Sequence, residues 1–204
     1  MSIKPYIICT LFFATTFGVA AQDLSKYPFE QGSFVLIREN VSHNAGPVST
    51  LCKEITWFTN NGNNKAIEVE NEMNLNGMTI SDRSLLILNI TNKAIVWWTM
   101  DLSKKTGTKF TQAHSTKMKN AIVETKAFGK ETYLGYECEK KHTKFANGDE
   151  LTALMYGDLA MKTELTLGNG GKTFTRIISI SLDPPPASKF KIPNDIKITE
   201  QKTI

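Results

Sequence analysis

The residue types that most often carry catalysis or bind metals are sparse and scattered in this sequence. Its three histidines are His43, His114 and His142, and none has a second ligand type at the spacing of a metal site. The patterns H-x-x-x-H, C-x-x-C, H-E-x-x-H and G-x-S-x-G do not occur. We therefore expect no metal, no cofactor and no catalytic residues, and we predict that the protein is not an enzyme.

Two short segments resemble functional motifs only superficially. Gly168-Asn169-Gly170-Gly171 is rich in glycine, but the Lys-Ser/Thr sequence of a phosphate-binding loop does not follow it. It predicts a hairpin turn instead. The adjacent acids Asp149 and Glu150 could do acid–base chemistry in principle, but neighbouring acids in a polar turn are usually just solvated.

The first 21 residues have the three parts of a secretory signal peptide. Lys4 supplies a positive charge, the stretch from Tyr6 to Val19 is uncharged and mostly apolar, and small residues precede a cleavage site near Ala21. The apolar stretch is short for a membrane span, which needs roughly 20 residues. We expect a periplasmic or secreted protein that begins near Gln22, with an uncleaved anchor as the alternative.

The remainder of the chain has the length and composition of one domain. About 180 residues follow the predicted cleavage site, an ordinary single-domain length. We predict one β domain over residues 22–198 and a short tail at 199–204, with no stable membrane span. The formal net charge of the full chain is +4, and the positive charge is dispersed. No basic stripe is present, so we do not expect a nucleic-acid partner.

Two cysteines remain after the signal peptide, which contains Cys9. In an oxidising compartment Cys52 and Cys138 have only one possible pairing. A bridge across so long a loop would contribute about 4–5 kcal/mol on the chain-entropy model. The alternative is two separate buried thiols that pack as small apolar residues.

Most of the mature sequence has the pattern of β-strands separated by short turns. We predict strands over residues 33–39, 50–59, 65–70, 84–90, 93–100, 131–145, 151–156, 162–167 and 173–182. Eight or nine such strands favour a large antiparallel sheet. The Asn-rich segment 60–64 and residues 169–171 predict tight turns with positive φ.

Other segments are predicted as connections, a helix and a tail. Residues 77–82 read as a turn or connection, and 101–111 as a polar stretch with Gly107. Residues 115–128 are the one helix candidate, because Met118 and Ile122 are four residues apart. In the last predicted strand Ile178, Ile180 and Leu182 alternate with serines, which indicates one buried face. The prolines at 184–186 end that strand and begin a stiff extended tail.

The strongest local signal is a β-hairpin over residues 84–100 whose two faces are both apolar. Trp97 and Trp98 must point to opposite faces, since successive side chains in a strand alternate. A strand with one solvated face should alternate apolar and polar residues, so both faces of this hairpin should lie against something apolar. Its apolar residues could line a ligand pocket, or they could be core residues of a central strand pair. The candidate ligand-lining residues are Leu86, Leu88, Ile90, Val96, Trp97, Trp98 and Met100.

Three segments resemble the LolA-like exported proteins. They are ILNITNKAIVWWTMDLSKKTGTKFT, LGYECEKKHTKFANGDELTALMYGDLAMKTEL and SKFKIPNDIKI. The resemblance spans roughly residues 32–198, and its best-matched positions are Gly135, Tyr136, Cys138, Phe190 and Pro193. It implies a mainly β fold of the α+β kind, with a strongly curved antiparallel sheet that forms an unclosed half-barrel and has one or more covering helices. It implies no catalytic residues, since the activity of that family is binding.

The resemblance, export and the apolar hairpin lead to one functional expectation with an alternative. We expect a protein that binds a lipid, an acyl chain or another apolar ligand in the hollow of the half-barrel, an inference from fold analogy. The alternative is a structural or protein-interaction module of the cell envelope with a filled core, a protein partner and no ligand.

Overall fold

The structure is a computed structural model that describes residues 26–41, 49–75, 78–113 and 122–202. The predicted signal peptide, His43 and His114 lie outside these residues. Within them the chain forms twelve strands and two short 3-10 helices, η1 (Asn60–Gly62) and η2 (Ala187–Phe190). The strands are β1 (Gly32–Val41), β2 (Ser49–Thr59), β3 (Asn64–Leu75), β4 (Met78–Ile90), β5 (Ala94–Asp101), β6 (Thr106–Ala113), β7 (Ile122–Tyr133), β8 (Tyr136–Phe145), β9 (Glu150–Tyr156), β10 (Leu159–Thr166), β11 (Lys172–Ser181) and β12 (Lys197–Lys202).

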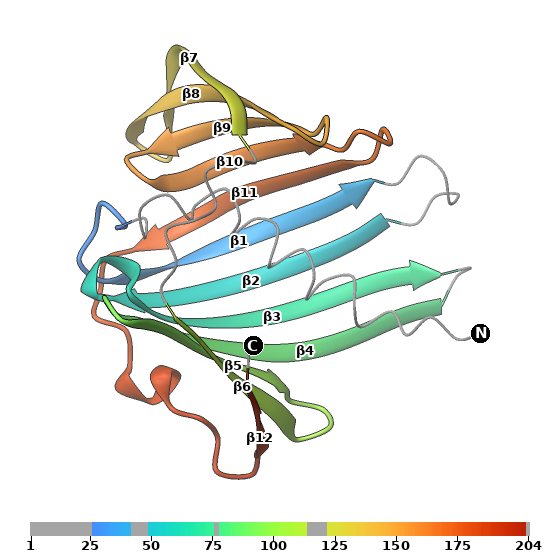
Figure 1. Cartoon of the computed structure of the whole chain (residues 1–204), viewed down its shortest axis with the longest axis vertical. Coiled ribbons are helices and arrows are strands. Elements are labelled where there is room, and N and C mark those ends of the chain that lie inside the picture. Colours follow the sequence, from blue (N-terminus) through green and yellow to red (C-terminus); the bar gives the residue numbers. More distant parts are fainter. Residues whose placement is uncertain (1–25, 42–48, 76–77, 114–121, 203–204) are drawn as a thin grey trace.

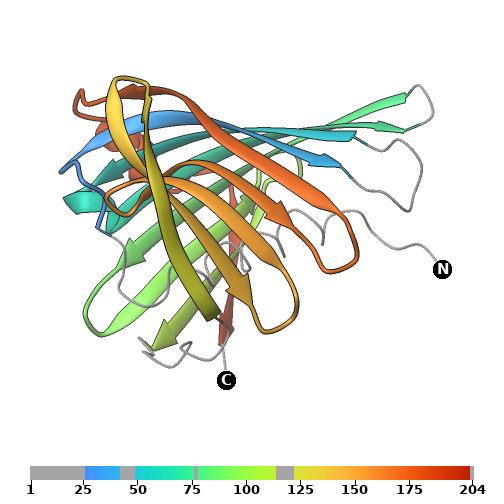
Figure 2. The same ribbon diagram turned by 90° about the horizontal axis from the view of Figure 1, so that it is seen from above.

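All twelve strands belong to one open sheet. Their order is β12-β6-β5-β4-β3-β2-β1-β11-β10-β9-β8-β7, so β12 and β7 are the two edges and the sheet does not close. Every pairing is antiparallel except that of β12 with β6. Figures 1 and 2 show that the sheet is strongly twisted and curved. The predicted fold class, a mainly β, strongly curved antiparallel sheet that forms an unclosed half-barrel, is confirmed.

Tight turns join β2 to β3, β7 to β8 and β10 to β11. Asn60 and Asn61 have φ of 53°, and Gly62 and Gly170 also have positive φ, as predicted for the β2–β3 and β10–β11 turns. The predicted strand over 131–145 is in fact two strands. It is divided because Leu134 and Gly135, at φ of 50° and 83°, turn the chain back between β7 and β8.

Four further segments differ from what the sequence predicts. The segment 115–128 is not a helix where it is described, since β7 begins at Ile122 and pairs with β8 along its length. Residues 78–82 are not a turn but the start of β4, paired with the end of β3. The polar stretch 101–111 contains most of β6, and the C-terminal tail returns to the sheet as β12. In each case pairing with a neighbouring strand outweighs a weak local pattern.

The burial predicted for the last strand is wrong in part, because Ile180 packs against a buried apolar cluster but Ile178 and Leu182 do not. Ile178 and Leu182 are 45% and 49% exposed, whereas Ile177 is fully buried. The cause is an irregularity in the pairing of β1 with β11, where Val35 lies opposite Ser179 but Leu36 lies opposite Ile177. This bulge leaves Ile178 without a partner and shifts the alternation by one residue.

The buried side chains form separate clusters. The largest, which includes Phe34, Phe58, Met161 and Ile177, joins β1 and β2 to β8–β11. A second consists of Leu85, Ile87, Met100 and Ile196, and a third of Cys52, Ile67 and Val69. No α-helix occurs in the described ranges, so the expected covering helix has no counterpart there. The C-terminal segment 184–202 contributes Ile196 to the second cluster instead.

Cys52 and Cys138 form no disulfide in the structure. They are two separate buried thiols, on β2 and β8, with four strands between them in the sheet. Each packs in a different apolar cluster. The pairing that the cysteine count allowed is therefore not made, because the sheet order places the two strands apart.

Among the described elements no helix has the length and apolarity that crossing a bilayer requires.

Candidate functional site

The register of the sheet assigns the residues of the β4–β5 hairpin to two faces. Trp57 lies opposite Ala66, Ala66 opposite Ile87, and Ile87 opposite Trp98, so these four side chains form one row across β2–β5. We call this side of the sheet the Trp98 face. The other side, which carries the next residue Trp97, is the Trp97 face.

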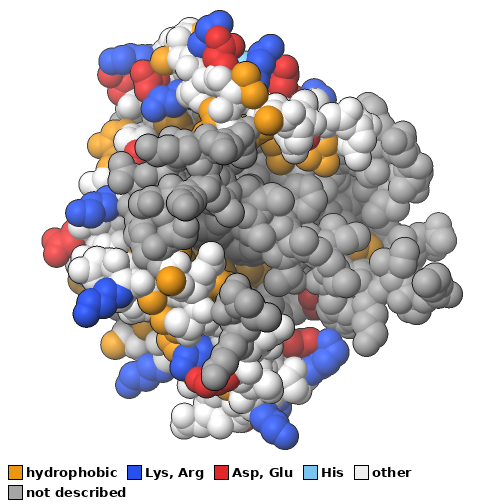
Figure 3. Space-filling model, viewed as in Figure 1, with side chains coloured by type: hydrophobic (Ala, Val, Ile, Leu, Met, Phe, Trp, Pro, Cys, Tyr) orange, Lys and Arg blue, Asp and Glu red, His pale blue; other side chains and the backbone are white. Residues whose placement is uncertain are grey.

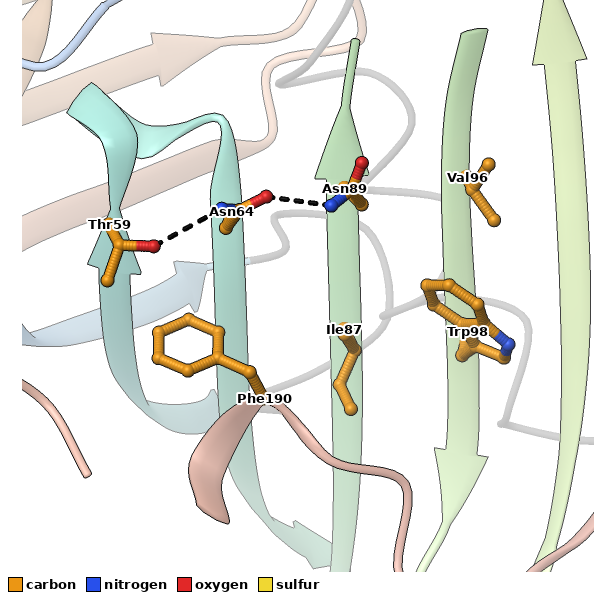
Figure 4. A pocket seen from close by; sticks show the side chains of 7 residues that line it. All are labelled: Thr59, Asn64, Ile87, Asn89, Val96, Trp98 and Phe190. Atoms are coloured by element: carbon orange, nitrogen blue, oxygen red, sulfur yellow. Dashed lines mark hydrogen bonds between the residues drawn. The ribbon is translucent and has the colours of Figure 1, made fainter. Parts of the chain in front are cut away.

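The Trp98 face carries a cavity of about 360 Å³ between the sheet and the C-terminal segment (Figure 4). Ile87, Val96, Trp98 and Phe190 supply its apolar wall. The volume lies within the range of small-molecule sites, which are mostly apolar with a few polar groups. Two of the seven predicted ligand-lining residues, Val96 and Trp98, therefore share one cavity.

A row of neutral polar side chains forms one end of this cavity. Thr59, Asn64 and Asn89 lie opposite one another in neighbouring strands, and apolar Val96 follows them on β5. The amide Nδ2 of Asn64 donates to Thr59 Oγ1 at 3.3 Å, and Nδ2 of Asn89 donates to Asn64 Oδ1 at 2.8 Å (Figure 4). The cavity is thus amphipathic, with a hydrogen-bonded polar row above an apolar wall.

The C-terminal segment is held over the Trp98 face by contacts on both sides of Phe190. Lys189 Nζ lies 2.8 Å from Glu68 Oε1 and 4.0 Å from the ring centroid of Trp57. After η2 the chain packs Ile196 against Leu85, Ile87 and Met100. Strand β12 then pairs in parallel with β6. These contacts fix the wall that Phe190 contributes.

Charged groups surround the cavity but do not line it. Its lining residues are Thr59, Asn64, Ile87, Asn89, Val96, Trp98 and Phe190, and none is ionisable. Lys109, opposite Trp98 in the sheet, forms an ion pair of 2.6 Å with Glu200. Lys189 is paired with Glu68. Both lysines are therefore neutralised by carboxylates.

The remaining predicted residues do not line this cavity. Met100 is 1% exposed and belongs to the second apolar cluster, so it is a core residue. Leu86, Leu88, Ile90 and Trp97 lie on the Trp97 face, where Leu86 packs against the third cluster. Trp97 stacks on Phe110 of β6, with ring centroids 5.3 Å apart. The two tryptophans thus have different surroundings.

The Trp97 face also carries a buried ion pair. Arg38 Nη2 lies 2.8 Å from Glu54 Oε1, and both side chains are about 5% exposed. Burial raises the pKa of the Glu54 carboxyl above its usual value, although the Arg38 charge and a hydrogen bond from Cys52 oppose the change. A carboxylate this deeply buried depends on its partner.

A second, larger cavity of about 580 Å³ lies between β1 and the strands β7–β11. It differs from the first because acidic and basic side chains line it, among them Glu131, Lys140 and Lys162. Glu131 forms ion pairs with both lysines, at 2.9 and 3.4 Å. Basic and acidic side chains are likewise interspersed at the periphery of the face seen in Figure 3.

Sequence reasoning missed five residues of the first cavity: Thr59, Asn64, Ile87, Asn89 and Phe190. The Asn-rich turn and the alternation in β4 could have pointed to some of them, given the pairing of β2, β3 and β4. Phe190 is more than 90 residues from Trp98 in the sequence, so no local pattern could place it there.

No group of three or more His, Cys, Asp or Glu residues suited to a metal occurs in the described ranges.

Comparison with known proteins shows similarity of structure but not of sequence. No family model matches the chain, and no curated protein matches it. An uncharacterized conserved protein from Thermus thermophilus is similar over 92% of this chain and 99% of its own, with a TM-score of 0.53 and 9% identity. At such identity the similarity shows the fold alone.

Other solved structures are more distant. MucB, crystallised in complex with MucA(peri), matches 91% of this chain and 61% of its own, with a TM-score of 0.46 and 10% identity. The LolA superfamily protein NE2245 from Nitrosomonas europaea matches 87% and 97%, with a TM-score of 0.31 and 8% identity.

Proposed function

We propose that this chain is an exported, non-enzymatic protein of the cell envelope that binds a lipid, an acyl chain or another apolar ligand. The observation that carries the proposal is the cavity beside Trp98, where aliphatic and aromatic side chains from β4, β5 and η2 surround about 360 Å³. This position, between the sheet and the C-terminal segment, replaces the less specific expectation of a ligand in the hollow of the half-barrel. The signal-peptide pattern of residues 1–21 supports export.

The composition of the site supports binding rather than catalysis. An apolar ligand would gain about 25 cal/mol for each Å² that it buries. The aromatic rings of Trp98 and Phe190 lie at the wall, with the side chain of Ile87 between them (Figure 4). The lining has no acid, base or nucleophile that is set against a partner for chemistry, beyond the hydroxyl of Thr59. The seven residues proposed from the sequence are now divided, and Val96 and Trp98 are the two that we assign to the ligand.

The two adjacent tryptophans give a matched test. Titration with an acyl-chain ligand should change the tryptophan fluorescence of the mature protein. Trp98→Leu should abolish most of that change and weaken binding at least tenfold, since burying such a side chain against a ligand is worth about 1.5–3 kcal/mol. Trp97→Leu is the control: it removes the stacking on Phe110 and should leave affinity within about twofold.

Native mass spectrometry of protein purified from the envelope adds an independent readout. Bound lipid in the wild type that is lost in the Trp98 variant would support the site. Absence of any bound lipid, together with no fluorescence response in either variant, would refute the proposal.

A second candidate function, a module that binds a protein partner, has one specific observation in its favour. Edge strand β7 carries Val123 and Phe128 with 69% and 58% of their surfaces exposed. Both stand at irregularities in the pairing with β8, which turn their side chains out of the regular alternation. Loss of partner capture in Phe128→Ser, with ligand binding intact, would separate this role from the first.

A further inference from the structure

We infer that the cavity beside Trp98 selects apolar ligands whose head group is polar but uncharged, such as a hydroxyl, an ester or an amide. This inference rests on the proposed function and specifies the ligand class of the same site. It follows from the polar row of Thr59, Asn64 and Asn89 and from the uncharged lining of the cavity.

The polar row has hydrogen-bonding capacity left over. Asn64 uses its Oδ1 to accept from Asn89 and one N–H to donate to Thr59. The Thr59 hydroxyl accepts that bond and retains its own hydrogen as a donor. Within the described part of the chain no hydrogen bond involves Asn89 Oδ1, which remains an acceptor. One neutral group that both donates and accepts, as a hydroxyl does, would complement these atoms.

An ionised head group would find no side chain of opposite charge among the residues that line the cavity. A charge at the polar row would keep part of its hydration, since Asn89 is exposed, but the uncharged lining offers it no ion pair. Two cations next to lining residues, Lys109 opposite Trp98 and Lys189 beside Phe190, lie 2.6 and 2.8 Å from their own carboxylates. Recruiting either lysine would break a contact that holds the C-terminal segment, and Phe190 with it. A carboxylate or phosphate is therefore disfavoured although the whole chain has a net charge of +4.

The test compares three probes that share one acyl chain and differ only in the head group. They are monododecanoylglycerol, dodecanoate and dodecyltrimethylammonium, each titrated below its micelle concentration at mildly alkaline pH with tryptophan fluorescence as the readout. We expect the neutral glyceride to bind about two- to tenfold more tightly than either ion, because the ions lose part of their solvation at this partly exposed row without gaining a partner. Dodecanoate should approach the glyceride in affinity as the pH falls and the acid becomes neutral, whereas the glyceride should not change.

Variants of the polar row locate the selectivity. Asn89→Leu should weaken glyceride binding by about 2- to 12-fold, the value of one hydrogen bond, and should leave the two ions unchanged. Asn92→Leu is the matched control, since Asn92 lies in the β4–β5 turn and does not line the cavity. Equal or tighter binding of dodecanoate at alkaline pH would overturn the inference while the proposed function stands. If none of the three probes binds the wild type, and Trp98→Leu also shows no fluorescence response, both this inference and the proposed function are overturned.

Discussion

Removing one partner of the Arg38–Glu54 ion pair should destabilise the fold strongly, whereas removing both should not. The pair joins β1 to β2 on the Trp97 face, with 2.8 Å between Nη2 and Oε1 and with both side chains about 5% exposed. Arg38→Met or Glu54→Met leaves a buried charge without its counter-ion, which costs about 3–5 kcal/mol. That is a large share of the roughly 5–15 kcal/mol by which domains are stable. The double variant should recover most of the loss, because an apolar pair of similar volume carries no desolvation penalty.

A double-mutant cycle measured by urea unfolding checks this prediction. The control is the exposed pair Arg83–Glu70, in which the two atoms are 3.3 Å apart but the side chains are 61% and 50% exposed. Its single variants should cost no more than about 1 kcal/mol. If the Arg38 and Glu54 single variants also cost no more than the exposed pair, or if their effects simply add, the reasoning from burial is refuted.

The pH dependence of stability gives a second readout of the same pair. Burial raises the pKa of Glu54 in the folded protein above its unfolded value, so folding favours the protonated form. The associated stability is present below the unfolded pKa and is lost as the pH rises through the folded pKa. Wild type should therefore lose stability relative to Glu54→Gln, which does not titrate, as the pH increases from acidic to neutral. A relative gain over that range would contradict the direction of the shift.

Two further predictions concern the cysteines and Gly107. Cys52 and Cys138 should both react with a thiol reagent after unfolding without a reductant, since the structure contains no bridge between them; a chain that shows no reactive thiol until it is reduced would refute this. Gly107→Ala should destabilise the protein by about 1–3 kcal/mol and expose the C-terminal segment to proteolysis, because the added Cβ would lie 2.8 Å from Thr99 O and from Ile198 Cδ1. Thr106→Ala, at an exposed neighbouring position, should have little effect on either readout.

Local patterns predicted those parts of the fold that depend on neighbours in the sequence. The β4–β5 hairpin was predictable because its two apolar runs flank a short polar break at residues 91–92. The turn at Asn60 and Asn61 was predictable because asparagine tolerates positive φ. The opposite orientation of Trp97 and Trp98 followed from the two-residue period of a strand.

What sequence could not supply was the pairing of distant segments. Strand β12 reaches β6 across about 90 residues, as the Lys109–Glu200 ion pair shows, and its own sequence has no strong strand pattern. The bulge opposite Leu36 depends on the register between β1 and β11, so the exposure of Ile178 could not be read from β11 alone. The same C-terminal segment brings Phe190 to the cavity. The polar row of Thr59, Asn64 and Asn89 could not be predicted either, because it exists only when β2, β3 and β4 pair in this register.

Ligand binding in the cavity beside Trp98 depends on the docking of the C-terminal segment, because different parts of the chain supply its two walls. Strands β2–β5 supply one side of the cavity and Phe190 supplies the other, so a ligand that contacts both binds only the docked arrangement. A ligand that binds only one state stabilises that state by RT ln(1 + [L]/Kd), where [L] is the free ligand concentration. Lys189, which touches Glu68 and Trp57 but does not line the cavity, can then alter affinity without contacting the ligand. The affinity of the site for this reason depends on the sheet and its C-terminal segment together, since the β4–β5 hairpin provides only part of one wall.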